Sequence, residues 1–104
     1  MGETVTVNLK TPLISPEGEV KRIVIREPTF EEYLTEGDPY TIAASQGGIP
    51  FMVENADVIK RYMTICLVEP KDPAILLQCK ARVAKEIKEK FLSFFRPDDA
   101  DGEG

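Results

Sequence analysis

The chain has 104 residues, which is enough for one domain with one modest hydrophobic core. Its 13 basic and 18 acidic residues give a net charge of −5, whereas a nucleic-acid-binding protein needs a basic face. Histidine, the usual general base near neutral pH and the commonest metal ligand, is absent. We therefore expect a binding protein rather than an enzyme, with no metal, no cofactor and no nucleic-acid partner.

The sequence also argues against a membrane or secreted protein. No apolar run approaches the roughly 20 residues needed to cross a bilayer, and the opening residues lack the apolar core of an export signal. Cys66 and Cys79 are not arranged as a CxxC pair, so we expect reduced thiols rather than a zinc site or a disulfide. These features predict a cytoplasmic protein.

The first quarter of the chain has the pattern of an antiparallel β-hairpin, at about residues 4–26. Polar and apolar residues alternate over Thr4–Leu9, which is typical of a half-buried strand, and Val20–Arg26 is rich in β-branched residues. Between them, Ser15-Pro16-Glu17-Gly18 has the composition of a turn, with Gly18 free to take a positive φ.

A type I turn followed by a bulge at Gly18 would set the register of this hairpin. It places Ser15 opposite Glu19, Leu9 opposite Ile25 and Thr11 opposite Ile23. Pro12 has no N–H to donate, so we expect it to face away from the partner strand or to lie at an irregularity. The expected core face consists of Val5, Val7, Leu9, Leu13, Ile23 and Ile25.

Three to five helices are expected between about residues 30 and 95. Thr29 and Glu32 form a capping-box pattern, and Gly37 is a helix terminator. Asp38-Pro39 resembles the start of another short helix, which Gly47-Gly48 would break, leaving a mobile loop. The next helix is predicted at about Asn55–Leu67, with its buried face formed by Ala56, Ile59, Tyr62, Met63 and Cys66.

The last helical segment is predicted to open at Asp72-Pro73 and to run to Phe95. Pro97 would stop it, and residues 97–104 are too acidic and too rich in glycine to pack, so residues 1–96 form the single expected α+β domain. The apolar stripe comprises Leu76, Cys79, Val83, Ile87, Phe91 and Phe94. The end of the helix is apolar on more than one face, so either the domain covers it or it is a protein-binding surface formed by Phe91, Leu92, Phe94 and Phe95.

The chain resembles the tail assembly chaperones of Mu-like and related contractile-tailed phages. The resemblance lies in Val7-Asn8-Leu9-Lys10-Thr11-Pro12, in the turn Gly18-Glu19, and in the strand end Arg26-Glu27-Pro28-Thr29. It covers most of residues 4–95 and includes the paired Phe94-Phe95. The last helix of family members is often broken at the position of Gln78-Cys79-Lys80, where this sequence has no glycine or proline, so both a broken and an unbroken helix remain open.

The resemblance implies a role in viral tail morphogenesis, encoded by a phage or a prophage. Such chaperones oligomerise, cover the apolar helical segments of the tape-measure protein and help to recruit tail-tube protein. At the strand end, we expect Arg26 to bond a carboxylate or a backbone carbonyl and to fix the strand-to-helix angle. Two other functions are consistent with the sequence: a structural tail component retained in the virion, and a small regulatory domain that binds another protein.

Overall fold

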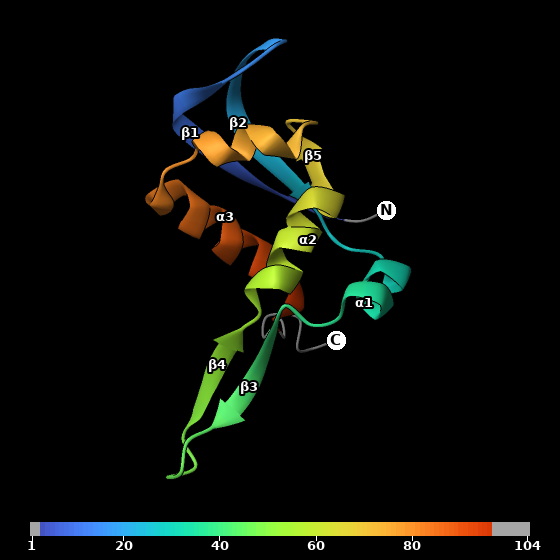
Figure 1. Cartoon of the computed structure of the whole chain (residues 1–104), viewed down its shortest axis with the longest axis vertical. Helices are drawn as coiled ribbons and strands as arrows, with labels where there is room; N and C mark the ends of the chain where they lie inside the picture. Colours follow the sequence, from blue (N-terminus) through green and yellow to red (C-terminus); the bar gives the residue numbers. More distant parts are fainter. Residues whose placement is uncertain (1–2, 97–104) are drawn as a thin grey trace.

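The computed structural model describes residues 3–96 (Figure 1). The fold is α+β, with an N-terminal antiparallel hairpin followed by helices, as the sequence predicts. The predicted tail, residues 97–104, lies outside the described residues. In chain order the elements are β1 (Thr4–Ser15), β2 (Gly18–Arg26), α1 (Phe30–Glu36), β3 (Tyr40–Ala44), β4 (Pro50–Glu54), α2 (Ala56–Cys66), β5 (Leu67–Glu69), the 3-10 helix η1 (Pro73–Gln78), α3 (Ala81–Leu92) and the 3-10 helix η2 (Ser93–Phe95).

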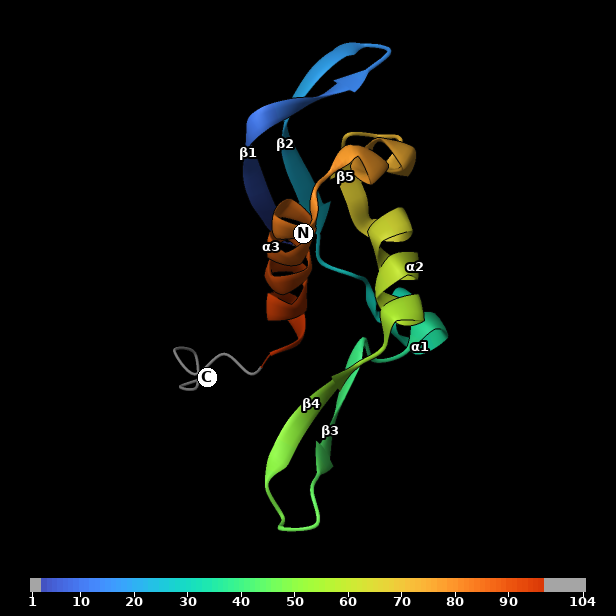
Figure 2. The same ribbon diagram turned by 60° about the vertical axis from the view of Figure 1, so that its left-hand side comes forward.

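The N-terminal sheet has the strand order β1-β2-β5, and α2 and α3 bury their apolar faces against the same core. The predicted core face is largely confirmed, with Val5 and Leu9 only partly buried. The β3–β4 hairpin projects from the opposite end of this body in both views (Figure 1, Figure 2), and the molecule extends 50 × 32 × 27 Å. The buried core consists of Val7, Leu13, Val20, Ile23, Ile25, Val58, Ile59, Tyr62, Cys66, Ile75, Ile87, Phe91 and Leu92.

The predicted register of the first hairpin is wrong at the turn, and it is wrong again further along because the ladder is not continuous. Ser15 lies opposite Gly18, whose φ of 128° is positive as expected. The register then shifts between Asn8 and Leu13, so that Pro12 lies at an irregularity. Observed partners are Val5 with Ile25, Val7 with Ile23, and Leu13 with Val20. The shift changes which residues of β2 face inward, and it adds Val20 to the core, which a single alternating pattern excludes.

Two predictions for the middle of the chain have opposite outcomes. The capping box is confirmed: the Glu32 N–H donates to Thr29 Oγ1 at 3.2 Å, and the Thr29 N–H donates to Glu32 Oε1 at 2.9 Å. Gly37 ends α1, also as predicted. The helix expected after Asp38-Pro39 is absent, however; the described chain forms β3 there. Tyr40 and the β-branched residues after it favour a strand, and this preference outweighs the capping signal.

The later helices differ from prediction mainly at their ends. α2 begins after its N-cap Asn55 as expected, although Ala56 is exposed and Val58 takes a place in the core. Asp72 caps η1, with its Oδ1 accepting from the Ala74 N–H at 2.9 Å. Of the two alternatives for the last segment, the broken helix is observed: η1 ends at Gln78 and α3 begins at Ala81.

Arg26 joins three elements of the body. Its Nη1 and Nη2 donate to Glu32 Oε1 and Oε2 at 2.9 and 2.7 Å, which is a two-pronged pair between β2 and α1. Nη2 also donates to the Ile65 carbonyl of α2 at 3.2 Å, and Nη1 donates to the Glu27 carbonyl at 3.2 Å. The predicted bonds of Arg26 to a carboxylate and to backbone carbonyls are therefore confirmed.

Replacing Arg26 with lysine is expected to lower the free energy of unfolding by about 1.5–3 kcal/mol, since an ammonium group cannot make the parallel pair of bonds. The matched control is Arg22→Lys, because Arg22 pairs with Glu69 on the exposed surface at 3.3 Å. That change is expected to cost less than about 1 kcal/mol. Urea unfolding of both variants measures the difference, and equal losses would contradict the role assigned to Arg26.

The same pair predicts an acid dependence of stability. The hydrogen bonds from Arg26, and then from the Thr29 amide, lower the pKa of Glu32 from 4.5 to about 2. Because the folded-state pKa is depressed, the stabilisation is complete above pH 4.5 and is lost as the pH falls toward 2. The stability gap between the native chain and Glu32→Gln should therefore narrow over this range. Chemical unfolding at a series of pH values tests this, and a gap independent of pH would disprove it.

Candidate functional site

Aromatic side chains from three elements meet near the end of η2. The Phe95 ring lies 6.2 Å from Tyr33 of α1, 5.6 Å from Tyr62 of α2 and 5.4 Å from Phe91 of α3, measured between ring centroids. Tyr62 and Phe91 are fully buried, whereas Phe95 and Phe94 are half-buried. Phe95 therefore connects the core to the surface.

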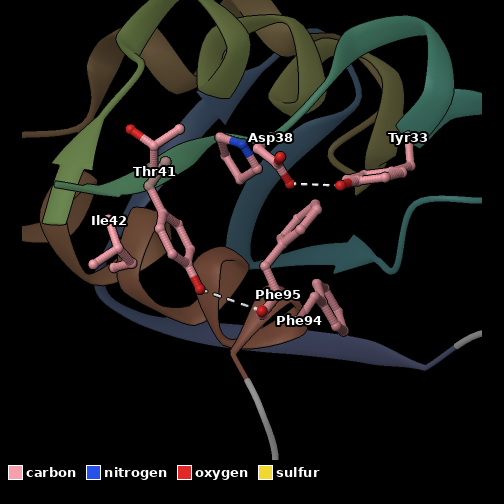
Figure 3. A pocket seen from close by; sticks show the side chains of 8 residues that line it. Tyr33, Asp38, Thr41, Ile42, Phe94 and Phe95 are labelled. Atoms are coloured by element: carbon pink, nitrogen blue, oxygen red, sulfur yellow. Dashed lines mark hydrogen bonds between the residues drawn. The ribbon is translucent and has the colours of Figure 1, made fainter.

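Two hollows open on either side of Tyr33, Phe94 and Phe95, which line both of them. We call the two together the aromatic groove. The larger has a volume of about 570 Å³ and continues along residues 38–42 at the foot of β3 (Figure 3). The smaller, of about 250 Å³, continues along residues 27–30 at the start of α1.

Hydrogen bonds hold the walls of the groove in place. The Tyr33 hydroxyl donates to Asp38 Oδ1 at 2.7 Å, and the Tyr40 hydroxyl donates to the Phe95 carbonyl at 3.2 Å (Figure 3). The first of these bonds raises the pKa of Tyr33. Behind the groove, the Tyr62 hydroxyl donates to the Gly37 carbonyl at 2.7 Å, and burial raises the pKa of Tyr62 to about 12. Both phenols are therefore neutral structural donors at physiological pH.

The structure divides the predicted protein-binding residues into two pairs. Phe91 and Leu92 are 0% and 1% exposed, so these two do not form a surface and the prediction is wrong for them. The reason is that the sheet and α2 cover more of the last helix than one helical stripe requires. Phe94 and Phe95 stay half-buried in the aromatic groove, where they can contact a partner.

Sequence reasoning missed two exposed apolar surfaces. One is the outer face of α1, where Phe30 is 79% and Leu34 is 64% exposed. Residues four apart lie on the same side of a helix, and Phe30 also lines the aromatic groove. The other is the β3–β4 hairpin, which we call the arm. Residues 39–53 contain no charged side chain, in a chain of which 30% is charged, and this signal was available from the sequence.

Residues 3–96 contain no cluster of three or more potential metal ligands, and no helix among them is long and apolar enough to span a membrane. Cys66 is buried and Cys79 half-buried, both as free thiols, and burial raises the pKa of Cys66 to about 11. Comparison with protein-family models, curated proteins and solved structures yielded no match.

The exposed face of α1 should be dispensable for folding. Phe30→Ser is expected to change the free energy of unfolding by less than about 0.5 kcal/mol, because truncation of an exposed side chain removes few contacts within the fold. Phe91→Ala, in the same aromatic neighbourhood, is expected to cost about 3–5 kcal/mol. Thermal or urea unfolding measures both, and a large loss in Phe30→Ser would show that this residue serves the fold and not a partner.

Proposed function

We propose that this chain is a tail assembly chaperone, a non-catalytic protein that covers apolar helical segments of a tape-measure protein and helps to recruit tail-tube subunits. It would act in the cytoplasm of the cell in which a phage or prophage is expressed. The observation that carries the proposal is the exposed apolar pair Phe30 and Leu34 beside the aromatic groove.

The geometry of this surface suits a helical client. Phe30 and Leu34 protrude from α1, and Phe94 and Phe95 line the adjoining hollow, so a ridge and a groove lie side by side. An amphipathic helix docks by placing its apolar face into such a groove. Fully burying one of these side chains contributes about 1.5–3 kcal/mol, so a few contacts are enough for specific binding.

The resemblance and the geometry support the proposal through different residues. The resemblance rests on the first hairpin and on Arg26-Glu27-Pro28-Thr29, which set the direction of α1 through the Arg26–Glu32 pair and the cap at Thr29. The next residue, Phe30, is the first exposed apolar side chain of the client surface. The motif thus positions this surface, and its residues Glu27, Pro28 and Thr29 also line the smaller hollow.

Co-expression with the tape-measure protein of the same genome tests the proposal. The native chain should raise the soluble fraction of the tape measure, and the double variant Phe30→Ser/Leu34→Ser should bind it at least about tenfold more weakly. Leu77→Ser is the matched control, because Leu77 is 87% exposed on η1, which does not line the groove. The measurement is the soluble tape measure remaining after centrifugation.

A tape measure that is equally insoluble with and without the native chain would overturn the chaperone proposal. Mass spectrometry of purified particles separates the chaperone from a structural tail component. A chaperone should be missing from finished particles, whereas a structural subunit should be present in stoichiometric amount.

A further inference from the structure

The arm lacks the support that usually stabilises two paired strands. It projects from the body in both views (Figure 1, Figure 2), and its sheet has the order β3-β4 within residues 3–96. An isolated two-stranded hairpin is marginal in water, and stability normally requires further strands or a covering helix. A further strand would provide that support.

Both faces of the arm are apolar. Tyr40, Ile42 and Met52 lie on one face, and Phe51 and Val53 lie on the other. All but Tyr40 are exposed, with Ile42 63% exposed. A partner that packed against one face of the arm would leave the other face in water. Adding strands at the edge of the sheet, in contrast, covers the side chains next to the joined edge on both faces.

Two backbone hydrogen bonds fix the direction in which each residue of the arm points. The Asn55 N–H donates to the Pro39 carbonyl at 2.7 Å, and the Ser45 N–H donates to the Ile49 carbonyl at 3.0 Å. Both pairs belong to the same antiparallel register as the rest of the arm. Hydrogen-bonded and non-hydrogen-bonded pairs alternate along such a ladder, so every second residue between these points turns its backbone outward.

On β3 the outward-facing residues are Tyr40, Ile42 and Ala44, and their backbone groups have no backbone partner within residues 3–96. The outer edge of β1, in contrast, has a hydrogen-bonding partner at Ile14. The Gln78 side chain accepts from the Ile14 N–H at 2.9 Å and donates to the Ile14 carbonyl at 2.7 Å. An open, uncharged edge strand is a template for pairing with another strand.

The other edge of the arm is interrupted by a proline. On β4 the outward-facing residues are Pro50, Met52 and Glu54. Pro50 has no N–H to donate, and Glu54 is held by Lys88 of α3 at 2.8 Å. The edge of β3 is therefore better suited to pairing than the edge of β4.

We propose that β3 pairs antiparallel with β3 of a second copy of this chain, with Ile42 on the two-fold axis. Ile42 then faces its own counterpart, and Tyr40 faces the small residue Ala44 in both directions. Each of these pairs brings together outward-facing groups and exchanges two hydrogen bonds. The result is a continuous sheet with the order β4-β3-β3-β4 across the dimer.

The charges of the chain are compatible with this pairing. The same register places Asp38 of one copy opposite Gln46 of the other, so no acid faces an acid. Each chain carries a net charge of −5, and pairing at the projecting arms keeps the two bodies apart. The tip of each arm comes to the foot of the other, beside the hollow of about 570 Å³ that residues 38–42 line.

The strand is better matched by a second copy than by the proposed client. A helix satisfies its own backbone groups internally, so a helical tape-measure segment cannot complete the edge of β3. The two proposals are tested by different changes, because client binding uses Phe30 and Leu34 of α1 beside the smaller hollow, whereas dimerisation uses the backbone of β3, which lies along the larger one.

Multi-angle light scattering on the full chain tests the proposal with two proline variants of the same arm. The native chain should have twice the mass of the 11.6 kDa monomer. Ile42→Pro removes an outward-facing N–H from the β3 edge without breaking the β3–β4 ladder, and it should be monomeric. Met52→Pro makes the equivalent change on the β4 edge, and it should remain dimeric. Circular dichroism checks that both variants keep the native fold.

Amide hydrogen exchange of the native chain gives a readout without substitutions. The amides of Ile42 and Ala44 should become protected as protein concentration rises, while that of Met52 should not. A native chain that is monomeric at high micromolar concentration, or a dimer unchanged by Ile42→Pro, would overturn the proposal. So would protection of Ile42 and Ala44 that appears only when a client is added, since the edge would then belong to a client strand.

Discussion

The arrangement of β2, α1 and α2 relative to one another depends on the contact between Arg26 and Glu32. One guanidinium group bonds the carboxylate of α1 with two parallel hydrogen bonds and also bonds a carbonyl of α2. The direction of α1 is fixed in this way relative to both the sheet and the helix behind it. Since α1 carries Phe30 and Leu34, the same contact determines where the exposed apolar face points.

The position of the arm depends on the far end of the same helix. α1 ends at Gly37, whose carbonyl accepts a hydrogen bond from the buried Tyr62 hydroxyl. Asp38 then bonds back to Tyr33, and Pro39 is fully buried at the foot of β3. The residues at the foot of the arm are thus fixed by hydrogen bonds and burial, although the arm itself makes few contacts with the rest of the described chain.

The sequence predicted those features that depend on neighbours in the chain. The capping box of Thr29 and Glu32, the terminator Gly37 and the N-caps Asn55 and Asp72 all involve residues within four positions of each other. The bond from Arg26 to the Ile65 carbonyl spans 39 positions, and no local pattern reveals it. The capping signal at Asp38-Pro39 was misleading, because the same residue types also occur at the start of a strand.

The arm escaped prediction because it is apolar on both faces. Periodicity identifies a strand by alternation and a helix by a stripe, and a segment without charges shows neither. The burial of Leu92 was missed for the opposite reason: the tertiary structure covers more of the helix than its own pattern suggests. The residues that cover Leu92 are distant from it in sequence, so no local pattern reveals its burial.

We propose two different partners for the two exposed apolar surfaces: a client helix for α1 and a second copy of the chain for the β3 edge. Native mass spectrometry of the complex with a tape-measure segment tests this separation most directly, with the native chain and Ile42→Pro compared. We expect two copies of the native chain in each complex with the tape-measure segment, and one copy of Ile42→Pro in each complex. If Ile42→Pro lost client binding together with the dimer, the client and the second copy would share one surface, which would contradict the proposed separation.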